Sequence, residues 1–252
     1  MTVSLTTLPQ GYRALVFGAS GGLGGALCRH IAADPRCAGL YAASRTGGDV
    51  AGAPGLAFTL EDPDTIRRAV ETAAAHGPLH LVIAATGALH SEAGLEPEKS
   101  WRQLDADRLA DAFKVNTILP ALIARHALDA LARGRSGAPE KAVFAALSAR
   151  VGSISDNRLG GWHGYRASKA ALNQIIRTLS IELARKRPHA VCAGLHPGTV
   201  DTRLSEPFQR NVPEGKLFSP DYSAERLLRV IDALGPDQSG RCFDWAGEEI
   251  TP

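Results

Sequence analysis

The sequence predicts an α/β fold: a single doubly wound domain over residues 1–252, built on a seven-stranded, mainly parallel sheet. Short, continuously apolar segments alternate along the chain with longer segments of helical periodicity. Such alternation is typical of parallel strands that helices cover on both faces. A chain of 252 residues with 44% hydrophobic content can bury one core of this kind without a second domain.

Seven apolar segments are expected to form the strands. In chain order they are residues 14–17, 39–43, 56–59, 79–85, 141–148, 190–195 and 241–244. Helices are expected over 66–76, 108–133 and 224–234, because Asp62-Pro63, Asp105 and Ser223 stand before them as start signals. Glycine, proline and polar residues predict loops over 45–54 and 202–219.

A glycine-rich turn follows the first predicted strand and precedes an alanine-rich helical segment that ends near Ala33. Its sequence is Val16-Phe17-Gly18-Ala19-Ser20-Gly21-Gly22-Leu23-Gly24-Gly25. Because glycines carry no side chain, backbone N–H groups and the helix N-terminus can approach a pyrophosphate there. The spacing Gly-x-x-x-Gly-x-Gly differs from the commoner Gly-x-Gly-x-x-Gly, and such a turn can also be purely structural. Its place after the first strand favours dinucleotide binding.

Tyr165 and Lys169 are the strongest candidates for acid-base chemistry. Four residues separate them in Gly164-Tyr165-Arg166-Ala167-Ser168-Lys169, so on a helix they share one face. A free tyrosine has a pKa of about 10, and a fixed cation one turn away stabilises its phenolate. The alternative is an exposed ring beside a solvated lysine.

The glycine turn and the Tyr-x-x-x-Lys pair together resemble the short-chain dehydrogenase/reductase family, from Arg13 to about Glu249. Residues 147–157 and 160–169 are similar to its C-factor and sniffer-type carbonyl reductase branch. The resemblance implies a Rossmann-type NAD(P)-binding domain that reduces a ketone or aldehyde by hydride transfer. It also implies four catalytic residues, namely Asn116, Ser148, Tyr165 and Lys169.

Each of these residues has a role by resemblance. Tyr165 would donate the proton, and Lys169 would stabilise the tyrosinate and hold the nicotinamide ribose. Asn116, in Lys114-Val115-Asn116-Thr117, would hold a water in a proton relay.

Ser148 ends the fifth predicted strand and would hydrogen-bond the substrate oxygen. Many relatives carry two serines here, and the second position corresponds to Ala149, while Ser153 is a competing candidate. His163 and His196 are interpreted as lining the site or as structural.

The residues that follow the strands are expected to bind the cofactor, because ligands of open α/β sheets bind at the carboxyl ends of the strands. Arg45 follows the second strand, and its guanidinium suits the 2′-phosphate of NADP(H), which is favoured over NAD(H). Asp49 nearby complicates this choice, and Arg45 can also be a solvated loop residue. Thr59 stands where relatives usually carry aspartate. The predicted cofactor set is Gly18, Ser20, Gly21, Gly22, Leu23, Gly24, Ser44, Arg45, Thr59, Leu60, Ala85, Thr86, Gly87, Tyr165, Lys169, Pro197, Gly198, Val200 and Thr202.

Composition and charge restrict the classes of partner that we expect the protein to bind. A net charge of +2 without a dense basic cluster argues against nucleic acid or a membrane surface as a main partner. The four cysteines lack metal-ligand spacing, so no metal is expected, and they fit reduced thiols in the cytoplasm. No signal segment or membrane span is recognised. By resemblance, residues 107–133 and 165–187 would pair copies into a homodimer or homotetramer.

Three interpretations of the function remain open. The first is reduction of a small ketone or aldehyde, with residues 89–101 and 202–219 determining which one. The second is a 3-oxoacyl-thioester, sugar/steroid-type or other alcohol dehydrogenase of the same family. The third is a C-factor-like nucleotide-binding signalling protein, against which the set Asn116, Ser148, Tyr165 and Lys169 argues.

Overall fold

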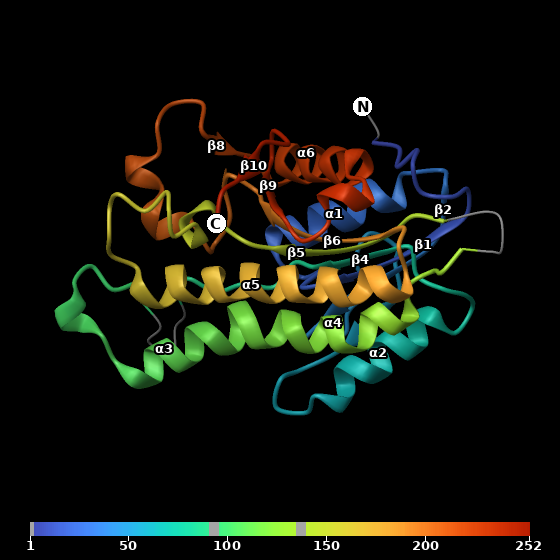
Figure 1. The fold of residues 1–252 in the computed structure, drawn as a ribbon, viewed down its shortest axis with the longest axis horizontal. Coiled ribbons are helices and arrows are strands. Elements are labelled where there is room, and N and C mark those ends of the chain that lie inside the picture. Colours follow the sequence, from blue (N-terminus) through green and yellow to red (C-terminus); the bar gives the residue numbers. More distant parts are fainter. Residues whose placement is uncertain (1–2, 91–95, 135–139) are drawn as a thin grey trace.

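The computed structural model describes residues 3–90, 96–134 and 140–252, and within them a central sheet has eight strands (Figure 1). The strand order is β10-β9-β6-β5-β4-β1-β2-β3. The bounds are β1 (Tyr12–Phe17), β2 (Cys37–Ser44), β3 (Gly55–Ala57), β4 (Leu81–Ala84), β5 (Ala142–Leu147), β6 (Ala190–His196), β9 (Cys242–Asp244) and β10 (Glu249–Ile250).

The predicted number of seven strands was wrong by one. All seven predicted strands are present and pair in parallel, and the eighth, β10, pairs antiparallel with β9. Since β10 has only two residues, one exposed and one buried, it carries no periodic signal that a sequence could show. A separate pair, β7 (Thr199–Val200) and β8 (Leu217–Phe218), lies outside this sheet.

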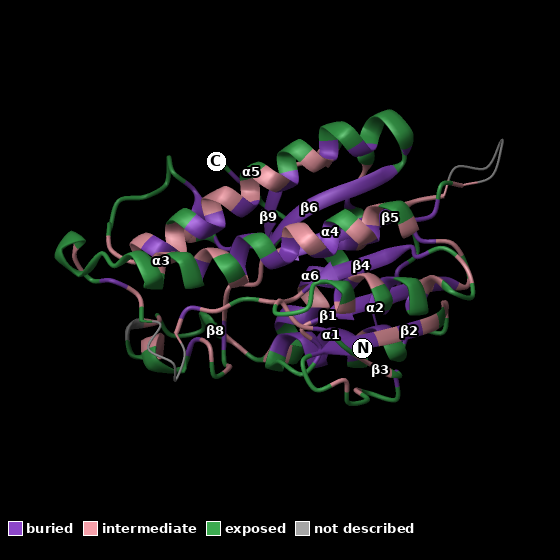
Figure 2. Ribbon diagram, turned by 90° about the horizontal axis from the view of Figure 1, so that it is seen from below, coloured by how far each residue is buried: buried purple, intermediate pink, exposed green. Residues whose placement is uncertain are grey.

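Helices cover both faces of the sheet, so the predicted α/β class and double winding are confirmed (Figures 1 and 2). One face carries α1 (Gly22–Ala32) and α6 (Pro220–Ala233). The other carries α2 (Asp64–Ala74), α4 (Leu119–Ala130) and α5 (His163–Lys186). Side chains alternate between the faces: Val16 of β1 packs toward α1 and α6, whereas Phe17 packs toward α2 and α4.

The long helix predicted over 108–133 is interrupted. It comprises α3 (Ala106–Phe113), a π-helical turn over Lys114–Ile118, and α4. The predicted start at Asp105 is confirmed, because its carboxylate accepts the N–H of Arg108 at 3.0 Å. The π turn contains Asn116, and π turns inside α-helices are frequent at functional sites.

The start of α6 lies earlier than predicted. Ser219 rather than Ser223 is the N-cap, since its hydroxyl accepts the N–H of Tyr222 at 3.2 Å and Pro220 occupies the first helical position. Ser223 is buried inside the helix instead and donates to the carbonyl of Pro197 at 2.8 Å.

Short 3₁₀ turns complete the chain: η1 (Trp101–Gln103), η3 (Arg150–Gly152), η4 (Glu206–Asn211) and η5 (Pro236–Gln238). The predicted loop over 202–219 therefore holds η4 and β8, while the loop over 45–54 holds only an isolated bridge between Val50 and Ala53. Of the predicted substrate segment 89–101, residues 91–95 lie outside the described residues. None of the described helices is long and apolar enough to cross a membrane.

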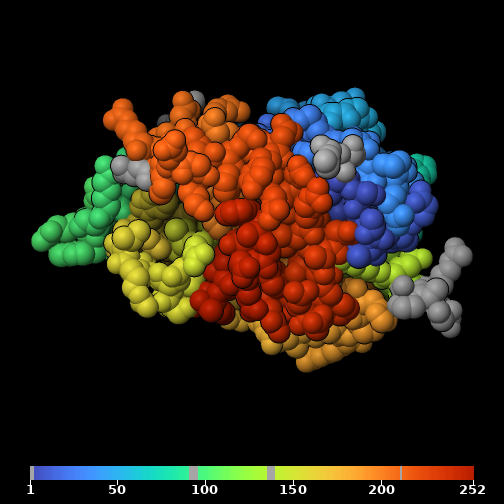
Figure 3. All heavy atoms as spheres, turned by 90° about the horizontal axis from the view of Figure 1, so that it is seen from above, coloured from blue at the N-terminus to red at the C-terminus, as the bar shows by residue number. Residues whose placement is uncertain are grey.

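Lys141, just before β5, joins the N-terminal segment to the end of α6. Its ammonium donates to Thr7 Oγ1 at 2.8 Å and to the carbonyls of Ile231 and Asp232 at 2.8 and 2.7 Å. These carbonyls belong to the last turn of α6, where a cation is favourable. Figure 3 shows the N-terminal segment in blue beside the red C-terminal part.

We expect Lys141→Met to lower the free energy of unfolding by about 1–3 kcal/mol, because it leaves partly buried carbonyls unpaired. Urea denaturation measures the change. The matched control is Lys114→Met, since Lys114 is exposed and its ion pair with Asp111 is exposed too, so the loss of stability should be much smaller. Equal losses in the two variants would contradict a specific role for Lys141.

Candidate active site

The glycine turn packs closely against the ends of β4 and β6. Gly18 has φ +81°, and a Cβ added to it would lie 2.7 Å from the carbonyl oxygen of Ala85. A Cβ added to Gly22 would lie 2.8 Å from Thr202 Cγ2. Gly18 therefore requires glycine, and a side chain at Gly22 would displace Thr202, so the turn lies close to both Ala85 and Thr202.

The N-terminus of α1 is open for an anion. Its N-cap is Gly21, no side chain caps it, and its first turn has no acidic residue. The first backbone N–H groups of the helix therefore lack partners within the helix, and the helix dipole favours negative charge there. Thr86 adds a buried Oγ1 that has no hydrogen-bond partner within the described parts of the chain. Both features fit the pyrophosphate part of a dinucleotide.

Ser44 and Arg45 stand at the end of β2, as predicted. Ser44 is buried and its hydroxyl accepts the N–H of Gly47 at 3.1 Å, while Arg45 is exposed. Asp49 has a hydrogen-bond partner within its own loop, because its carboxylate accepts the N–H of Gly55 at 2.8 Å. Asp49 thus has a structural partner, and Arg45 is in no ion pair among the residues described.

Thr59 and Leu60 follow β3 and are half-buried. The backbone N–H of Thr59 donates to Thr65 Oγ1 at 2.9 Å, and its hydroxyl bonds to the carboxylate of Glu61. The Thr59 hydroxyl is therefore already engaged within its own loop.

Tyr165 and Lys169 lie on the first turns of α5, and the Lys169 Nζ is 5.8 Å from the centroid of the Tyr165 ring. Lys169 is buried, and its ammonium donates to the carbonyl of Leu147 at 2.7 Å. Burial lowers the pKa of Lys169 to about 8 and raises the pKa of Tyr165 to about 12. No carboxylate pairs with this lysine in the described structure, so its charge is available to the phenol.

Asn116 lies close to the same lysine. A Cβ added to Gly87 would lie 3.5 Å from Asn116 Oδ1 and 3.7 Å from Lys169 Nζ. The Asn116 amide accepts from the N–H of Ala88 at 2.9 Å and donates to its carbonyl at 2.8 Å. Asn116 Nδ2 also donates to Ser168 Oγ at 3.3 Å. The structure thus brings the predicted asparagine to the lysine, and its part in a proton relay stays a prediction.

Ser148 has a partner that the sequence did not reveal. Its hydroxyl donates to Asn173 Oδ1 at 2.6 Å, and it also contacts the thiol of Cys242. Asn173 is eight residues beyond Tyr165, about 12 Å along the helix axis. These contacts connect β5, α5 and β9, and they direct the hydroxyl toward a different turn of α5. The predicted contact of Ser148 with substrate stays a prediction.

Ser153, the other candidate for the catalytic serine, also has a hydrogen-bond partner. Ser153 is buried, and its hydroxyl accepts the N–H of Asp156 at 3.1 Å in the loop after η3. It therefore stabilises the turn that precedes α5.

The segment after β6 lies against the glycine turn. Gly198 has φ +77°, and a Cβ added to it would lie 2.6 Å from the ring of Phe218. Val200 is buried, and Thr202 contacts the glycine turn at Gly22. Burial lowers the pKa of His196 to about 4, so this histidine is neutral near pH 7. His163 is half-buried at the start of α5.

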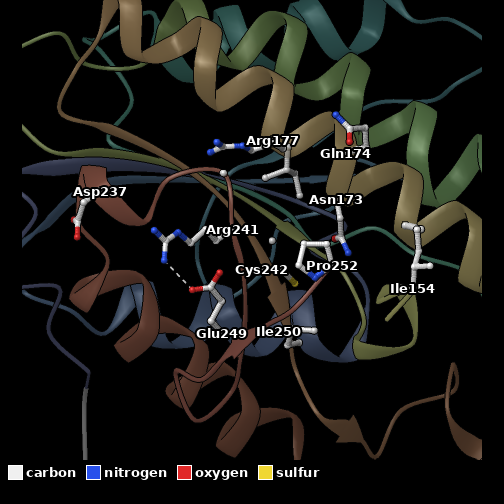
Figure 4. A pocket seen from close by; sticks show the side chains of 15 residues that line it. Ile154, Asn173, Gln174, Arg177, Asp237, Arg241, Cys242, Glu249, Ile250 and Pro252 are labelled. Atoms are coloured by element: carbon white, nitrogen blue, oxygen red, sulfur yellow. Dashed lines mark hydrogen bonds and ion pairs between the residues drawn. The ribbon is translucent and has the colours of Figure 1, made fainter. Parts of the chain in front are cut away.

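A cavity of about 580 Å³ lies between α5, β9 and β10 (Figure 4). It is bordered by Asn173, Arg177, Cys242 and Ile250, with the ion pair of Arg241 and Glu249 at 2.8 Å. Tyr165 and Lys169 are not among the described residues that line it. This cavity is therefore separate from the acid-base pair.

Two further groups near Tyr165 and Lys169 were not predicted from the sequence. Glu98 is buried and its carboxylate accepts the N–H of Gly164 at 3.0 Å, so it stabilises the start of α5. The second group is aromatic: the ring of Trp162 lies beside Tyr165 and contacts Phe208, which in turn contacts His90. A sequence could show the aromatic residues themselves, but not that distant segments bring them together.

This chain is similar in sequence to known proteins. A family model described as short chain dehydrogenase matches residues 12–213. The C-signal protein of Myxococcus xanthus is 38% identical over 148 residues, which are 58% of this chain and 80% of that protein. The 1-hydroxy-2-glutathionyl-2-methyl-3-butene dehydrogenase of Rhodococcus sp. (strain AD45) is 33% identical over 138 residues, 55% of this chain and 56% of that enzyme.

Solved structures have the same fold. The carbonyl reductase Sniffer of D. melanogaster superposes with a TM-score of 0.78 at 22% identity, over 95% of this chain and 99% of that one. The NADPH-bound carbonyl reductase from chicken fatty liver superposes with a TM-score of 0.80 at 22% identity, over 98% and 96% of the two chains. The family model covers most of the chain and C-signal is 38% identical, so the chain belongs to the short-chain dehydrogenase/reductase family.

Proposed function

We propose that this chain is an NADP(H)-dependent reductase that converts a ketone or aldehyde into an alcohol. One observation carries the proposal: the Nζ of Lys169, a buried lysine without a carboxylate partner in the described structure, lies 5.8 Å from the centroid of the Tyr165 ring. The glycine turn after β1 is suited to a dinucleotide. A buried ammonium that no anion neutralises is costly, so it is expected to serve chemistry.

The chain's own residues would hold the cofactor in three places. The glycine turn and the N-terminus of α1 would bind the pyrophosphate, with Thr86 Oγ1 as an additional polar group. Arg45 would bind the 2′-phosphate, and the segment from Pro197 to Thr202 would lie beside the nicotinamide. When bound, NADPH supplies the hydride. The fold neighbour from chicken fatty liver is described as NADPH-bound, which supports this choice.

Tyr165 would act as the general acid. As hydride reaches the carbonyl carbon, charge develops on the substrate oxygen, and the phenol donates its proton to that oxygen. The resulting phenolate is stabilised by the ammonium of Lys169, whose position is fixed by the carbonyl of Leu147. In the direction of oxidation the same phenolate would act as the base.

Two alternative functions can be distinguished from this reductase activity by experiment. A 3-oxoacyl-thioester or other alcohol dehydrogenase would use the same groups on a different substrate. A nucleotide-binding signalling protein is suggested by the 38% identity to C-signal. The cytoplasmic location and the homodimer or homotetramer stay predictions.

We expect Tyr165→Phe to lower kcat by at least about 100-fold, because the proton donor is lost, with NADPH binding retained. The measurement is NADPH oxidation with aldehydes, diketones and 3-oxoacyl thioesters as substrates. Tyr222→Phe is the matched control, since Tyr222 is 42% exposed on α6. Tight NADPH binding without turnover of any substrate would favour the signalling protein.

Arg45→Ala should raise the KM for NADPH about tenfold and leave that for NADH nearly unchanged, because only NADPH carries the 2′-phosphate. Arg68→Ala, which removes an exposed arginine paired with Asp62 on α2, is the control. A similar change for both cofactors would argue against a contact between Arg45 and the 2′-phosphate.

The rate of reduction should fall as pH rises through about 8. Burial lowers the pKa of Lys169 to about 8, so above that pH the ammonium loses its proton and no longer stabilises the phenolate. The phenol itself stays protonated there, because the pKa of Tyr165 is raised to about 12. A profile of kcat/KM from pH 6 to pH 10 measures this, and a flat profile would contradict it.

The variant Ser148→Ala distinguishes a structural role of this serine from a contact with the substrate. If the contact with Asn173 dominates, the free energy of unfolding falls by about 1–2 kcal/mol, kcat falls less than tenfold, and Asn173→Ala behaves alike. We expect this outcome from the geometry. If turnover instead drops at least about 100-fold while stability is unchanged, the substrate contact is established. Ser153→Ala tests the competing serine in the same assay.

A further inference from the structure

Three aromatic side chains from separate segments form a row of contacts that begins at the proposed acid. The Trp162 and Tyr165 ring centroids are 6.3 Å apart, and those of Trp162 and Phe208 are 5.2 Å apart. The His90 ring is 6.0 Å from that of Phe208, and all three pairs are edge-to-face. His90 follows β4, Trp162 precedes α5, and Phe208 lies in η4.

These rings are half-buried rather than part of either hydrophobic core. The Trp162 ring contacts both Tyr165 and Phe208. A half-buried aromatic surface next to a proton donor is the kind of wall that lines small-molecule sites.

Trp162 is held in a costly backbone conformation. Its φ of +53° and ψ of +43° lie in the left-handed region, which bulky residues seldom adopt. Gly160 and Gly161 before it also have positive φ, and the N–H of Trp162 donates to the carbonyl of Glu98 at 2.5 Å. Strain of this kind at a large residue points to a function for its side chain.

The other rings are fixed from a different direction. His90 Nε2 bonds to the carbonyl of Arg203 at 2.8 Å, which ties the segment after β4 to the segment that carries Phe208. Ser205 Oγ donates to the carbonyl of Val200 at 2.5 Å and so fixes the turn before η4. The rings are therefore positioned by hydrogen bonds at their own segments as well as by packing.

We propose that Trp162 and Phe208, with His90 beside them, form an aromatic recognition surface, and that the preferred substrates are aryl aldehydes and aryl ketones. A flat ring attached to the carbonyl can pack on this surface in edge-to-face or stacked geometry, which a saturated ring of the same size cannot match. The carbonyl oxygen would then lie toward the phenol of Tyr165. This inference rests on the proposed function and names its substrate class.

The test compares benzaldehyde with cyclohexanecarbaldehyde, which have the same carbon skeleton but differ in aromaticity. In the wild type, kcat/KM should favour benzaldehyde. Trp162→Gly should raise the KM for benzaldehyde about tenfold and that for the saturated aldehyde less than threefold, with little change in kcat. Glycine accepts the left-handed conformation freely, so this variant removes the ring without adding backbone strain.

Phe208→Leu is a second variant that keeps an apolar side chain, and it should shift the preference in the same direction. Leu159→Ala is the control, because Leu159 is 91% exposed in the same loop as Trp162. A second readout needs no turnover: ligand-observed NMR of benzaldehyde with the NADP⁺-loaded protein should show binding that Trp162→Gly weakens.

Equal changes of KM for the two aldehydes would overturn the inference, as would benzaldehyde binding that is unaffected by Trp162→Gly. If no carbonyl compound supports NADPH oxidation, the proposed function fails, and the NMR contrast between wild type and Trp162→Gly alone decides whether the aromatic surface binds aryl carbonyls.

Discussion

The ammonium of Lys169 is the charge around which the candidate site is arranged. It is buried, and the carbonyl of Leu147 at the end of β5 is its hydrogen-bond partner at 2.7 Å. Because a carbonyl carries no net charge, it orients the ammonium without neutralising it. Burying this charge costs free energy, which the rest of the fold has to offset. The hydrogen bond to Leu147 also requires that α5 stays at a fixed distance from the sheet.

That distance is maintained by polar contacts between α5 and its neighbours. Asn116 joins the segment after β4 to Ser168, and Thr117 Oγ1 donates to the carbonyl of Ser168 at 2.7 Å. Both residues lie in the π turn, and both contact Ser168 of α5. On the other side of α5, Ser148 and Asn173 form the corresponding contact to β5.

Periodicity and motif spacing predicted the parts of this molecule that depend on local sequence. The seven parallel strands, the glycine turn and the helical Tyr165–Lys169 pair belong to this group. The hydrogen-bond partners of individual polar groups could not be predicted from local sequence. Ser148 bonds to Asn173, which is 25 residues away, and Gly164 bonds to Glu98, which is 66 residues away. Ser219 and Ser223 illustrate the same limit, since either can cap a helix, and only the burial of Ser223 against Pro197 decides between them.

The strand β10 has a consequence for how copies of this chain can meet. It covers the edge of β9, which would otherwise present unpaired backbone groups to another molecule. The new edge is only two residues long, and Glu249 on it is charged and paired with Arg241. Short, charged edges resist strand addition, so a second copy is disfavoured from extending the sheet at this edge. At this end of the sheet, a contact between copies would therefore use side chains rather than backbone pairing, so it would differ from the strand-to-strand pairing of an aggregate.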